Sequence, residues 1–366
     1  MSNSPKNIAF VISGLDVGGA ELLVVETVLA LKSYYNSVHL LYLKNCNSLM
    51  DNNKYRDLNP LYLDFDKNGF IKSTLKLRKY IKNNKIDIVH SHLSLANIVT
   101  KVSSIGLSKL SFYNTYHNMD KRLAMKKPSV FVYNFIDRFF VNFFKNHFSI
   151  AISNAVKNYH CQVVKLRPGK VLTIYNGVFK NGQCLRANRG YSDIQKILTV
   201  GRLEEVKNIG EQIYFIKRIK ELGFDNVSLT IVGDGSEMDR LKNLVDNLHL
   251  NHCVEFLGSR LDTENIFPNY DLFISSSIVE GFGLTILEAI SYGLPVIATN
   301  TPAVKEILQN GKYGFLYSSG DLDQLVNTWQ KIVNVNNIKD FVTESYNYFK
   351  NNFSFETYLQ RIKDLE

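Results

Sequence analysis

The chain has 366 residues, of which 45% are hydrophobic and 21% charged. This length suits two compact domains, and the ordinary globular composition excludes a largely disordered protein. The formal net charge of +9 is unevenly divided, because residues 1–180 hold 25 Lys and Arg against 10 Asp and Glu, whereas residues 181–366 hold 18 against 24. The basic first half predicts an anionic partner (a membrane surface, a phosphorylated lipid or nucleic acid), unless it is simply a solvated surface.

Cysteine usage and hydropathy predict an intracellular protein. The four cysteines are Cys46, Cys161, Cys184 and Cys253, and no two of them form a C-x-x-C pair. This spacing argues against a zinc site and against a disulfide framework. The first residues lack the basic, apolar and small-residue regions of a signal peptide, and no window offers the 18 or so apolar residues of a membrane span. We therefore expect a cytoplasmic location. Peripheral attachment to the inner face of the membrane is compatible with it.

Short β-branched runs recur along the chain, separated by stretches long enough for helices. In the first half they occupy 8–13, 38–43, 86–90, 110–115, 148–152 and 171–174; in the second half they occupy 197–200, 228–232, 254–257, 272–275 and 295–298. This alternation predicts α/β architecture with two doubly wound, Rossmann-like parallel sheets. A polar segment at 181–193 is the predicted linker between domains 1–180 and 181–354, and a last helix at 355–366 packs on one of them.

In the first half, two motifs follow predicted strands. Gly18 and Gly19 precede a helix. Glycines at such a turn let the backbone approach an anion, and the helix dipole favours negative charge there. A turn with a purely structural role would have the same sequence pattern. His117 ends another strand and is predicted to hydrogen-bond a substrate hydroxyl or carry a proton, the alternative being a structural role. His90 and His92 are interpreted as structural.

In the second half, Arg202 and Lys207 follow the strand 197–200 and a Gly201 turn. Two cations near a helix start can neutralise a diphosphate and stabilise it as it departs, unless they are ordinary surface charges. A second strand–turn–helix at 229–243, with glycines at 233 and 235, fits either close packing against a nucleotide or a structural turn.

The most informative stretch is 275–299, which reads SSSIVEGFGLTILEAISYGLPVIAT. Gly281 and Gly283 free the backbone around Phe282, a helix is predicted from Leu284 to about residue 293, and Pro295 prevents its continuation. Glu280 lies in the loop and Glu288 about one turn into the helix. A carboxylate in that position is suited to accept hydrogen bonds from ribose hydroxyls, which leaves Glu280 nearer to a sugar.

These motifs together resemble the retaining GT-B glycosyltransferases of family 4. The resemblance rests on GGAE at 18–21, His117, Arg202 with Lys207, YNGV at 175–178 and the Glu-x7-Glu spacing of residues 280 and 288. It implies two Rossmann-like domains facing each other across a cleft, with the acceptor mainly on the first, the nucleotide sugar mainly on the second, and the helix 355–366 returning to the first domain.

The resemblance also implies roles for individual residues. Arg202 and Lys207 hold the diphosphate, Glu288 the ribose, and Glu280 with the 282–284 backbone the donor sugar. Gly18 and Gly19 close over the phosphates, and His117 contacts the donor sugar near the reacting carbon. The implied reaction is metal-independent transfer, with retention, of a hexosyl or N-acetylhexosaminyl unit from a nucleotide sugar, most often UDP-linked, and with no cofactor.

A basic, aromatic-rich segment at 121–148 carries six Lys and Arg before residue 146 and predicts contact with an anionic bilayer, the alternative being a core helix with a charged outer face. If the segment contacts a membrane, we expect the acceptor to be a lipid-linked or cell-surface glycan. We do not expect nucleic acid as a partner. Three other functions stay open: a non-hydrolytic nucleotide-sugar epimerase, a phosphorylase, for which no pyridoxal phosphate lysine is identified, and a membrane-binding protein with a vestigial nucleotide pocket.

Overall fold

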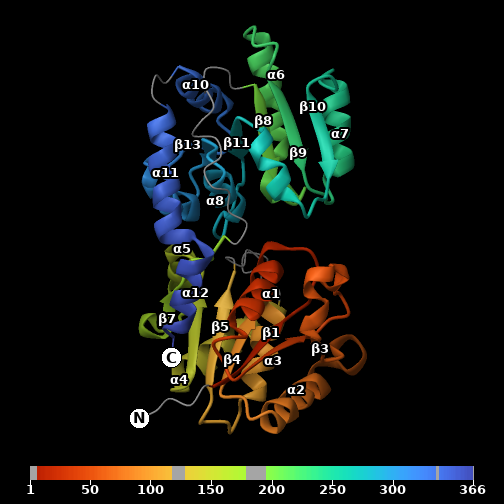
Figure 1. Cartoon of the computed structure of the whole chain (residues 1–366), viewed down its shortest axis with the longest axis vertical. Helices are drawn as coiled ribbons and strands as arrows, with labels where there is room; N and C mark the ends of the chain where they lie inside the picture. The colour runs from red at the N-terminus through yellow and green to blue at the C-terminus, as the bar shows by residue number, and fades with distance from the viewer. Residues whose placement is uncertain (1–5, 118–127, 179–194, 335–337, 366) are drawn as a thin grey trace. The chain divides into compact units, whose positions relative to one another are not determined.

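The computed structural model describes residues 6–117, 128–178, 195–334 and 338–365, with the side chains of 128 and 129 left out. The predicted linker at 181–193 and the start of the basic segment lie outside the described residues. The chain divides into two compact units, the first formed by Met1–Gly177 with Tyr358–Glu366 and the second by Val178–Thr357 (Figure 1).

The first unit contains a seven-stranded, wholly parallel sheet in the order β3-β2-β1-β4-β5-β6-β7. Its strands are β1 (Asn7–Ile12), β2 (Ser37–Tyr42), β3 (Leu61–Tyr62), β4 (Ile88–His92), β5 (Ser111–Tyr116), β6 (His147–Ala151) and β7 (Val171–Thr173). The strands β1, β4 and β5 at the centre of the sheet are nearly continuous runs of buried residues, as expected for parallel strands covered on both faces.

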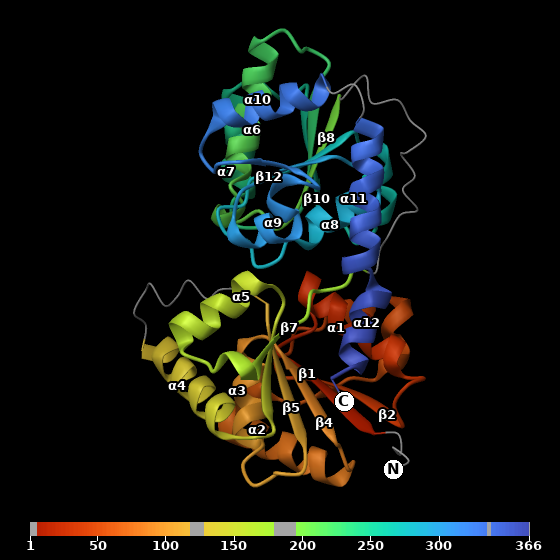
Figure 2. The ribbon, with the colours of Figure 1, turned by 90° about the vertical axis from the view of Figure 1, so that its left-hand side faces the viewer.

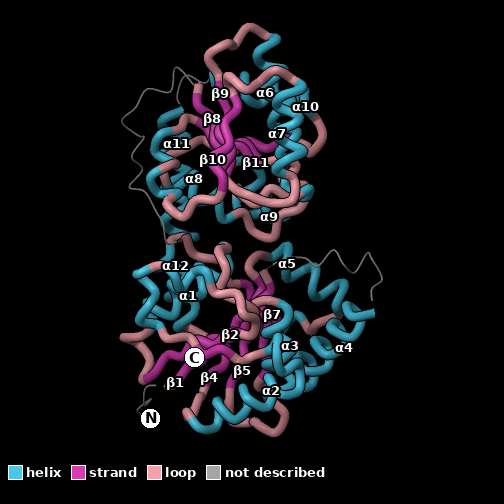
Figure 3. Tube along the Cα trace, turned by 90° about the vertical axis from the view of Figure 1, so that its right-hand side faces the viewer, coloured by secondary structure: helices cyan, strands magenta, loops and turns pink. Residues whose placement is uncertain are grey.

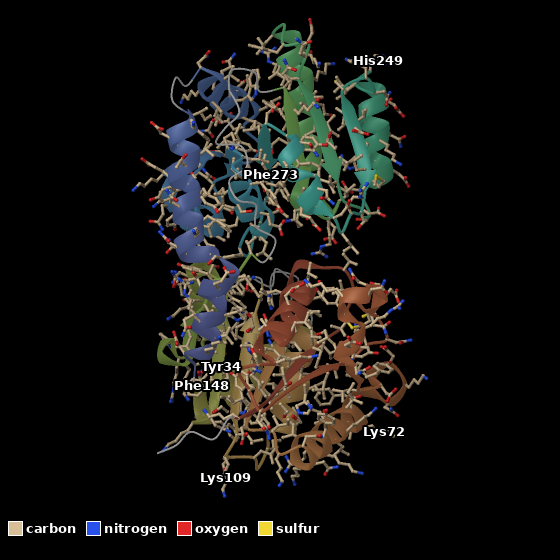
Figure 4. The ribbon with its side chains drawn as sticks, viewed as in Figure 1. Tyr34, Lys72, Lys109, Phe148, His249 and Phe273 are labelled. Atoms are coloured by element: carbon tan, nitrogen blue, oxygen red, sulfur yellow. The ribbon has the colours of Figure 1, made fainter. Side chains whose placement is uncertain are left out.

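Helices cover both faces of this sheet. They are α1 (Gly19–Leu31), α2 (Phe65–Asn83), α3 (Ser94–Ser103), α4 (Pro128–Phe143), α5 (Asn154–Tyr159) and α12 (Phe355–Lys363). Figure 2 shows α3 and α4 on one face and α1 with α12 on the other. Hydrogen bonds join the C-terminal segment to this unit, from Thr27 Oγ1 to Tyr358 Oη of α12 at 3.4 Å and from Tyr113 Oη to the carbonyl of Leu365, just after α12, at 2.7 Å. Tyr34, labelled in Figure 4, lies under the Lys363 ammonium at 4.8 Å.

The second unit contains a six-stranded parallel sheet in the order β10-β9-β8-β11-β12-β13. Its strands are β8 (Lys196–Val200), β9 (Ser228–Val232), β10 (Val254–Gly258), β11 (Leu272–Ser275), β12 (Val296–Thr299) and β13 (Phe315–Tyr317). Its helices are α6 (Ile209–Glu221), α7 (Met238–Asn247), α8 (Leu284–Ser291), α9 (Pro302–Ile307), α10 (Leu322–Val333) and α11 (Ile338–Phe353), which enclose the strands in Figure 3.

Each unit has its own apolar core between sheet and helices. In the second unit the core includes Trp329 of α10, and Phe273 of β11, labelled in Figure 4, is buried within the same unit. In the first unit one charged pair is fully buried: Lys101 Nζ of α3 lies 2.8 Å from Asp137 Oδ1 of α4, and both side chains are 0% exposed.

The structure confirms the predicted α/β architecture with two Rossmann-like parallel sheets. The eleven predicted strands are present, and their ends shift by one or two residues at most positions. The two short edge strands β3 and β13 were not predicted, because two or three residues are too few to show a strand pattern. Among the described residues, no helix is both long and apolar enough to cross a bilayer.

Candidate active site

The predicted donor residues lie at the point of the second sheet where the strand order reverses. From β8 the chain goes first to β9 on one side and later to β11 on the other, so the loops that follow β8 and β11 are neighbours at the carboxyl edge. In open α/β sheets this reversal point is where ligands bind. Arg202 and Lys207 lie after β8, and Glu280 lies after β11.

Lys207 and Glu280 contact each other directly. Lys207 Nζ donates to Glu280 Oε2 at 2.7 Å, and both side chains are largely buried, with exposures of 26% and 16%. Ser277 Oγ donates to the same carboxylate oxygen at 3.3 Å. The structure thus brings together two residues that are 73 positions apart in the sequence.

Buried polar groups hold the two loops in place. Ser276 Oγ donates to the carbonyl oxygens of Lys207 and Asn208 at 2.8 and 2.9 Å, and it accepts from Gln212 Nε2 at 2.8 Å. The Ile278 amide donates to the Val206 carbonyl at 2.9 Å. These hydrogen bonds fix the backbone of both loops and so restrict the positions of Lys207 and Glu280.

The glycine turn after β9 is explained by packing of backbone on backbone. A Cβ atom at Gly233 would lie 1.8 Å from the Gly201 carbonyl oxygen, and one at Gly235 would lie 2.4 Å from the Leu203 carbonyl oxygen. Both glycines also have positive φ values, of 147° and 158°. These glycines are therefore required by the loop that carries Arg202, which favours the structural interpretation of this turn.

Helix α8 begins as the sequence predicted and presents an uncapped N-terminus. Gly283 is the N-cap residue with φ 99°, and no side chain caps the helix or places a carboxylate in its first turn. The Phe282 ring is 2% exposed and packs edge-on against Phe353 at 5.9 Å, so the ring itself is a core residue and does not face a ligand. Gly281 and Leu284 are partly buried beside it, and Glu288 is half-buried one turn into the helix.

Arg202 is exposed to solvent, whereas Lys207 is largely buried. Its side chain is 76% exposed, and its Nη1 atom lies 3.0 Å from Glu204 Oε1 on the same loop. An exposed pair of this kind contributes little to stability, so the guanidinium is available for a ligand at small cost.

In the first unit, Gly18 and Gly19 lie at an equivalent reversal point, because β1 has β2 on one side and β4 on the other. Gly18 is the N-cap of α1 and has an extended φ of −162°, a conformation open to any residue. A Cβ atom there would lie 2.3 Å from Glu21 Oε2, the far end of a flexible side chain that can move aside, so neither the backbone conformation nor the space demands glycine. The carboxylate of GGAE therefore lies against Gly18, which the sequence alone did not indicate.

His117 follows β5 and is paired with a second histidine. His92 Nδ1, at the end of β4, lies 3.0 Å from His117 Nε2, and the two rings are tilted with centroids 5.3 Å apart. Burial lowers the pKa of His117 to about 4 and that of His92 well below its usual value, so both are neutral at pH 7. The structural interpretation of His92 was incomplete, because its partner is a predicted site residue.

A small cavity of about 100 Å³ adjoins His117. Aromatic and polar side chains from α3, β5, α4 and the segment after α5 line it, among them Asn97, Tyr116, Tyr133 and His160. The Tyr116 hydroxyl at its wall donates to Asp137 Oδ2 at 2.6 Å, so the cavity is built directly onto the buried Lys101–Asp137 pair.

The described residues contain no group of three or more His, Cys, Asp or Glu side chains placed to hold a metal ion. Asp-x-Asp spacing, typical of metal-dependent transferases, occurs at 64–66 and 321–323, and three of these four aspartates have local structural partners. Asp64 pairs with Lys76, Asp66 Oδ2 accepts from the Asn45 amide at 2.7 Å, and Asp321 caps α10 by accepting from the Gln324 amide at 2.9 Å.

Both halves of the chain match models of glycosyltransferase families. The family model described as Glycosyltransferase Family 4 matches residues 17–179, and that described as Glycosyl transferases group 1 matches residues 186–352. The chain is 29% identical over 311 residues to the UDP-Gal:alpha-D-GlcNAc-diphosphoundecaprenol alpha-1,3-galactosyltransferase of Escherichia coli, covering 81% of this chain and 79% of that protein.

A second relative and a solved structure agree with this. The N-acetyl-alpha-D-glucosaminyl L-malate synthase of Bacillus anthracis is 29% identical over 258 residues, covering 67% of this chain and 65% of that protein. The structure of Anabaena Alr3699/HepE in complex with UDP superposes with a TM-score of 0.81 at 20% identity, covering 98% of this chain and 99% of that one. The two parallel-sheet units, the motifs at their reversal points and the matches to both halves show that the chain is a glycosyltransferase of family 4 with the GT-B fold.

Proposed function

We propose that this glycosyltransferase moves a hexosyl or N-acetylhexosaminyl unit from a UDP-sugar to a lipid-linked glycan acceptor, with retention of the anomeric configuration and without a metal ion. The carrying observation is the Lys207–Glu280 pair beside the open N-terminus of α8. A helix N-terminus with a cation nearby is a ready site for a diphosphate.

The second unit supplies the donor chemistry in this proposal. Lys207 and Arg202 neutralise the diphosphate, Glu288 accepts hydrogen bonds from the ribose hydroxyls, and Glu280 with the 282–284 backbone binds the sugar. When the bond between the anomeric carbon and the diphosphate oxygen breaks, negative charge grows on the leaving group, and the two cations with the α8 dipole stabilise it. The acceptor oxygen then bonds to the anomeric carbon on the same face, and its proton passes to the leaving phosphate.

The first unit contributes Gly18 and Gly19 as a phosphate-binding helix start and His117 as a contact to the sugar. A lipid-linked acceptor is supported by the name of the Escherichia coli relative, which acts on a diphosphoundecaprenol substrate. The UDP donor is supported by the same name and by solved complexes of Anabaena Alr3699/HepE with UDP and with UDP-glucose.

Attachment to an anionic membrane is supported by α4. Four phenylalanines at four-residue spacing lie along one side of the helix and are exposed by 44–75%: Phe131, Phe135, Phe139 and Phe143. The basic residues Arg138, Lys145 and Arg167 are exposed beside them, and the Arg167 guanidinium lies 5.8 Å from the Phe143 ring. An apolar stripe flanked by cations is suited to lie in the interface of a bilayer with anionic headgroups.

Replacing Phe131, Phe135 and Phe143 together by serine is expected to abolish flotation of the protein with vesicles of phosphatidylglycerol and phosphatidylcholine. Without these rings, no apolar side chains of the stripe are left to enter the bilayer interface except Phe139. Binding then depends on the attraction between basic residues and anionic headgroups, which salt weakens. A matched control replaces Ile71 and Leu75, which are 72% and 59% exposed on α2, by serine. Retained flotation of the triple variant, or equal loss in the control, would show that the α4 stripe is not the attachment surface.

Binding of the donor is expected to raise the melting temperature of the second unit. A ligand at 100 times its dissociation constant adds about 2.7 kcal/mol of stability to the state that binds it. Calorimetric scans with UDP, UDP-glucose, UDP-galactose and UDP-N-acetylglucosamine measure this, with ADP at equal concentration as the control. The absence of any shift with all four UDP compounds would remove the basis for the UDP assignment.

A further inference from the structure

Three histidines lie side by side at the carboxyl ends of β4 and β5. The His90 and His92 rings have centroids 4.3 Å apart, and Phe10 of β1 stacks on His92 at 6.1 Å. His92 is 1% exposed, and the parallel register places it beside Thr115, two residues before His117. Its burial and its contacts with the Phe10 and His90 rings hold the His92 ring in place, with its Nδ1 atom directed toward His117.

The proton between the two rings has only two possible positions. Because both imidazoles are neutral, each carries one N–H. In one arrangement His117 Nε2–H donates to His92 Nδ1, and the His92 proton must then be on Nε2. That nitrogen is buried and has no hydrogen-bond partner among the described residues. In the other arrangement His92 Nδ1–H donates to His117 Nε2, and only a lone pair of His92 is left without a partner.

The second arrangement is favoured, because a buried N–H without an acceptor is rarer in proteins than an acceptor without a donor. We infer that His92 is a positioning residue that holds His117 in the Nδ1–H tautomer, so that His117 presents a hydrogen-bond donor to a substrate oxygen. His117 is only partly buried and borders the 100 Å³ cavity, so a substrate group can reach its ring.

This inference rests on the proposed transferase function and narrows the role of His117. With its Nε2 lone pair occupied by His92, the ring has no free basic nitrogen with which to accept the acceptor proton. Of the two roles predicted from the sequence, a donor to a substrate hydroxyl or phosphate oxygen is selected over a proton carrier. His92 does not touch the substrate and acts through His117 alone.

The tautomer is read directly from long-range proton–nitrogen correlation spectra of the full chain labelled with ¹⁵N-histidine. The eight histidines are few enough to resolve, and the spectrum of His117→Gln assigns the His117 signals by their loss. The wild-type protein is expected to show a protonated Nδ1 and a bare Nε2 for His117. A protonated Nε2 would overturn the inference whatever the activity of the protein.

Two substitutions of His92 separate positioning from simple packing. His92→Asn keeps an N–H donor near the place of Nδ1, whereas His92→Phe keeps a ring without a donor. His92→Phe is expected to lower kcat about 10- to 100-fold, the range seen when partners that orient metal-bound histidines are removed. His92→Asn is expected to keep kcat within about threefold of wild type and to keep the His117 tautomer.

His147→Asn is the matched control, because His147 is a buried histidine of the same unit that bonds to Ser104 at 2.8 Å. It is expected to leave the His117 signals unchanged. Equal kcat losses in His92→Asn and His92→Phe, or an unchanged His117 tautomer in His92→Phe, would contradict the inference. If the wild-type protein transfers no sugar, the proposed function fails, while the spectra still decide the tautomer.

Discussion

Replacing Glu280 by glutamine is expected to lower kcat/KM for sugar transfer by roughly 100- to 1,000-fold, the loss typical when one preorganised electrostatic group is removed from an active site. The physical reason is twofold. The carboxylate is the hydrogen-bond acceptor proposed for the donor sugar, and it also holds Lys207 Nζ at 2.7 Å. Without it, the ammonium that stabilises the leaving diphosphate loses its fixed position.

Lys207→Met is expected to cause a loss of the same order, and the double variant is expected to lose less than the product of the two single losses. Residues that act as one unit are not additive, so this double-mutant cycle measures their coupling. Glu205→Gln is the matched control, since Glu205 is an exposed carboxylate of the same loop. Initial rates of nucleoside diphosphate release give the values. A Glu280→Gln enzyme within twofold of Glu205→Gln would refute the assignment of the pair.

Replacing Asp137 by asparagine is expected to destabilise the first unit by about 3–5 kcal/mol, because a fully buried ammonium then has no counter-charge. Lys101 and Asp137 are both 0% exposed, and Asp137 also accepts from the Tyr116 hydroxyl at the cavity wall. Urea unfolding of the full chain, followed by near-ultraviolet circular dichroism, measures the change as an earlier transition for this unit.

The compensating variant makes this prediction specific. Lys101→Met combined with Asp137→Asn removes both charges and keeps an acceptor for Tyr116, so most of the lost stability is expected to return. Asp262→Asn breaks an exposed pair with Arg260 and is expected to leave the transition in place. An Asp137→Asn protein that unfolds at the wild-type urea concentration would show that the buried pair does not stabilise the unit.

The positions of most strands and of α8 were predictable, because each is encoded by a local pattern. The β-branched runs are contiguous, and α8 is bounded by glycines at 281, 283 and 293 and by Pro295, which fix its start and end within one turn. The strands β3 and β13 escaped prediction, since they exist only by pairing with β2 and β12.

The partners of the site residues were not predictable, since they depend on strand order. Lys207 meets Glu280 because β8 and β11 are neighbours, although 73 positions separate the two residues. His92 meets His117 because β4 and β5 pair in register. Lys101 gave no sign of burial in the sequence, because a lysine on a helix is normally exposed and its partner comes from a different helix. Side-chain identities indicated the chemistry, and topology decided which groups touch.

The most direct test of the account is transfer of radiolabelled sugar from a UDP-sugar to a diphosphoundecaprenol-linked glycan, followed by extraction of the lipid phase. Wild-type protein is expected to move label from UDP-galactose, UDP-glucose or UDP-N-acetylglucosamine into lipid, and Glu280→Gln to fall by roughly two to three orders of magnitude. Label that never enters lipid from any of these donors, or that enters equally with Glu280→Gln, would contradict the account.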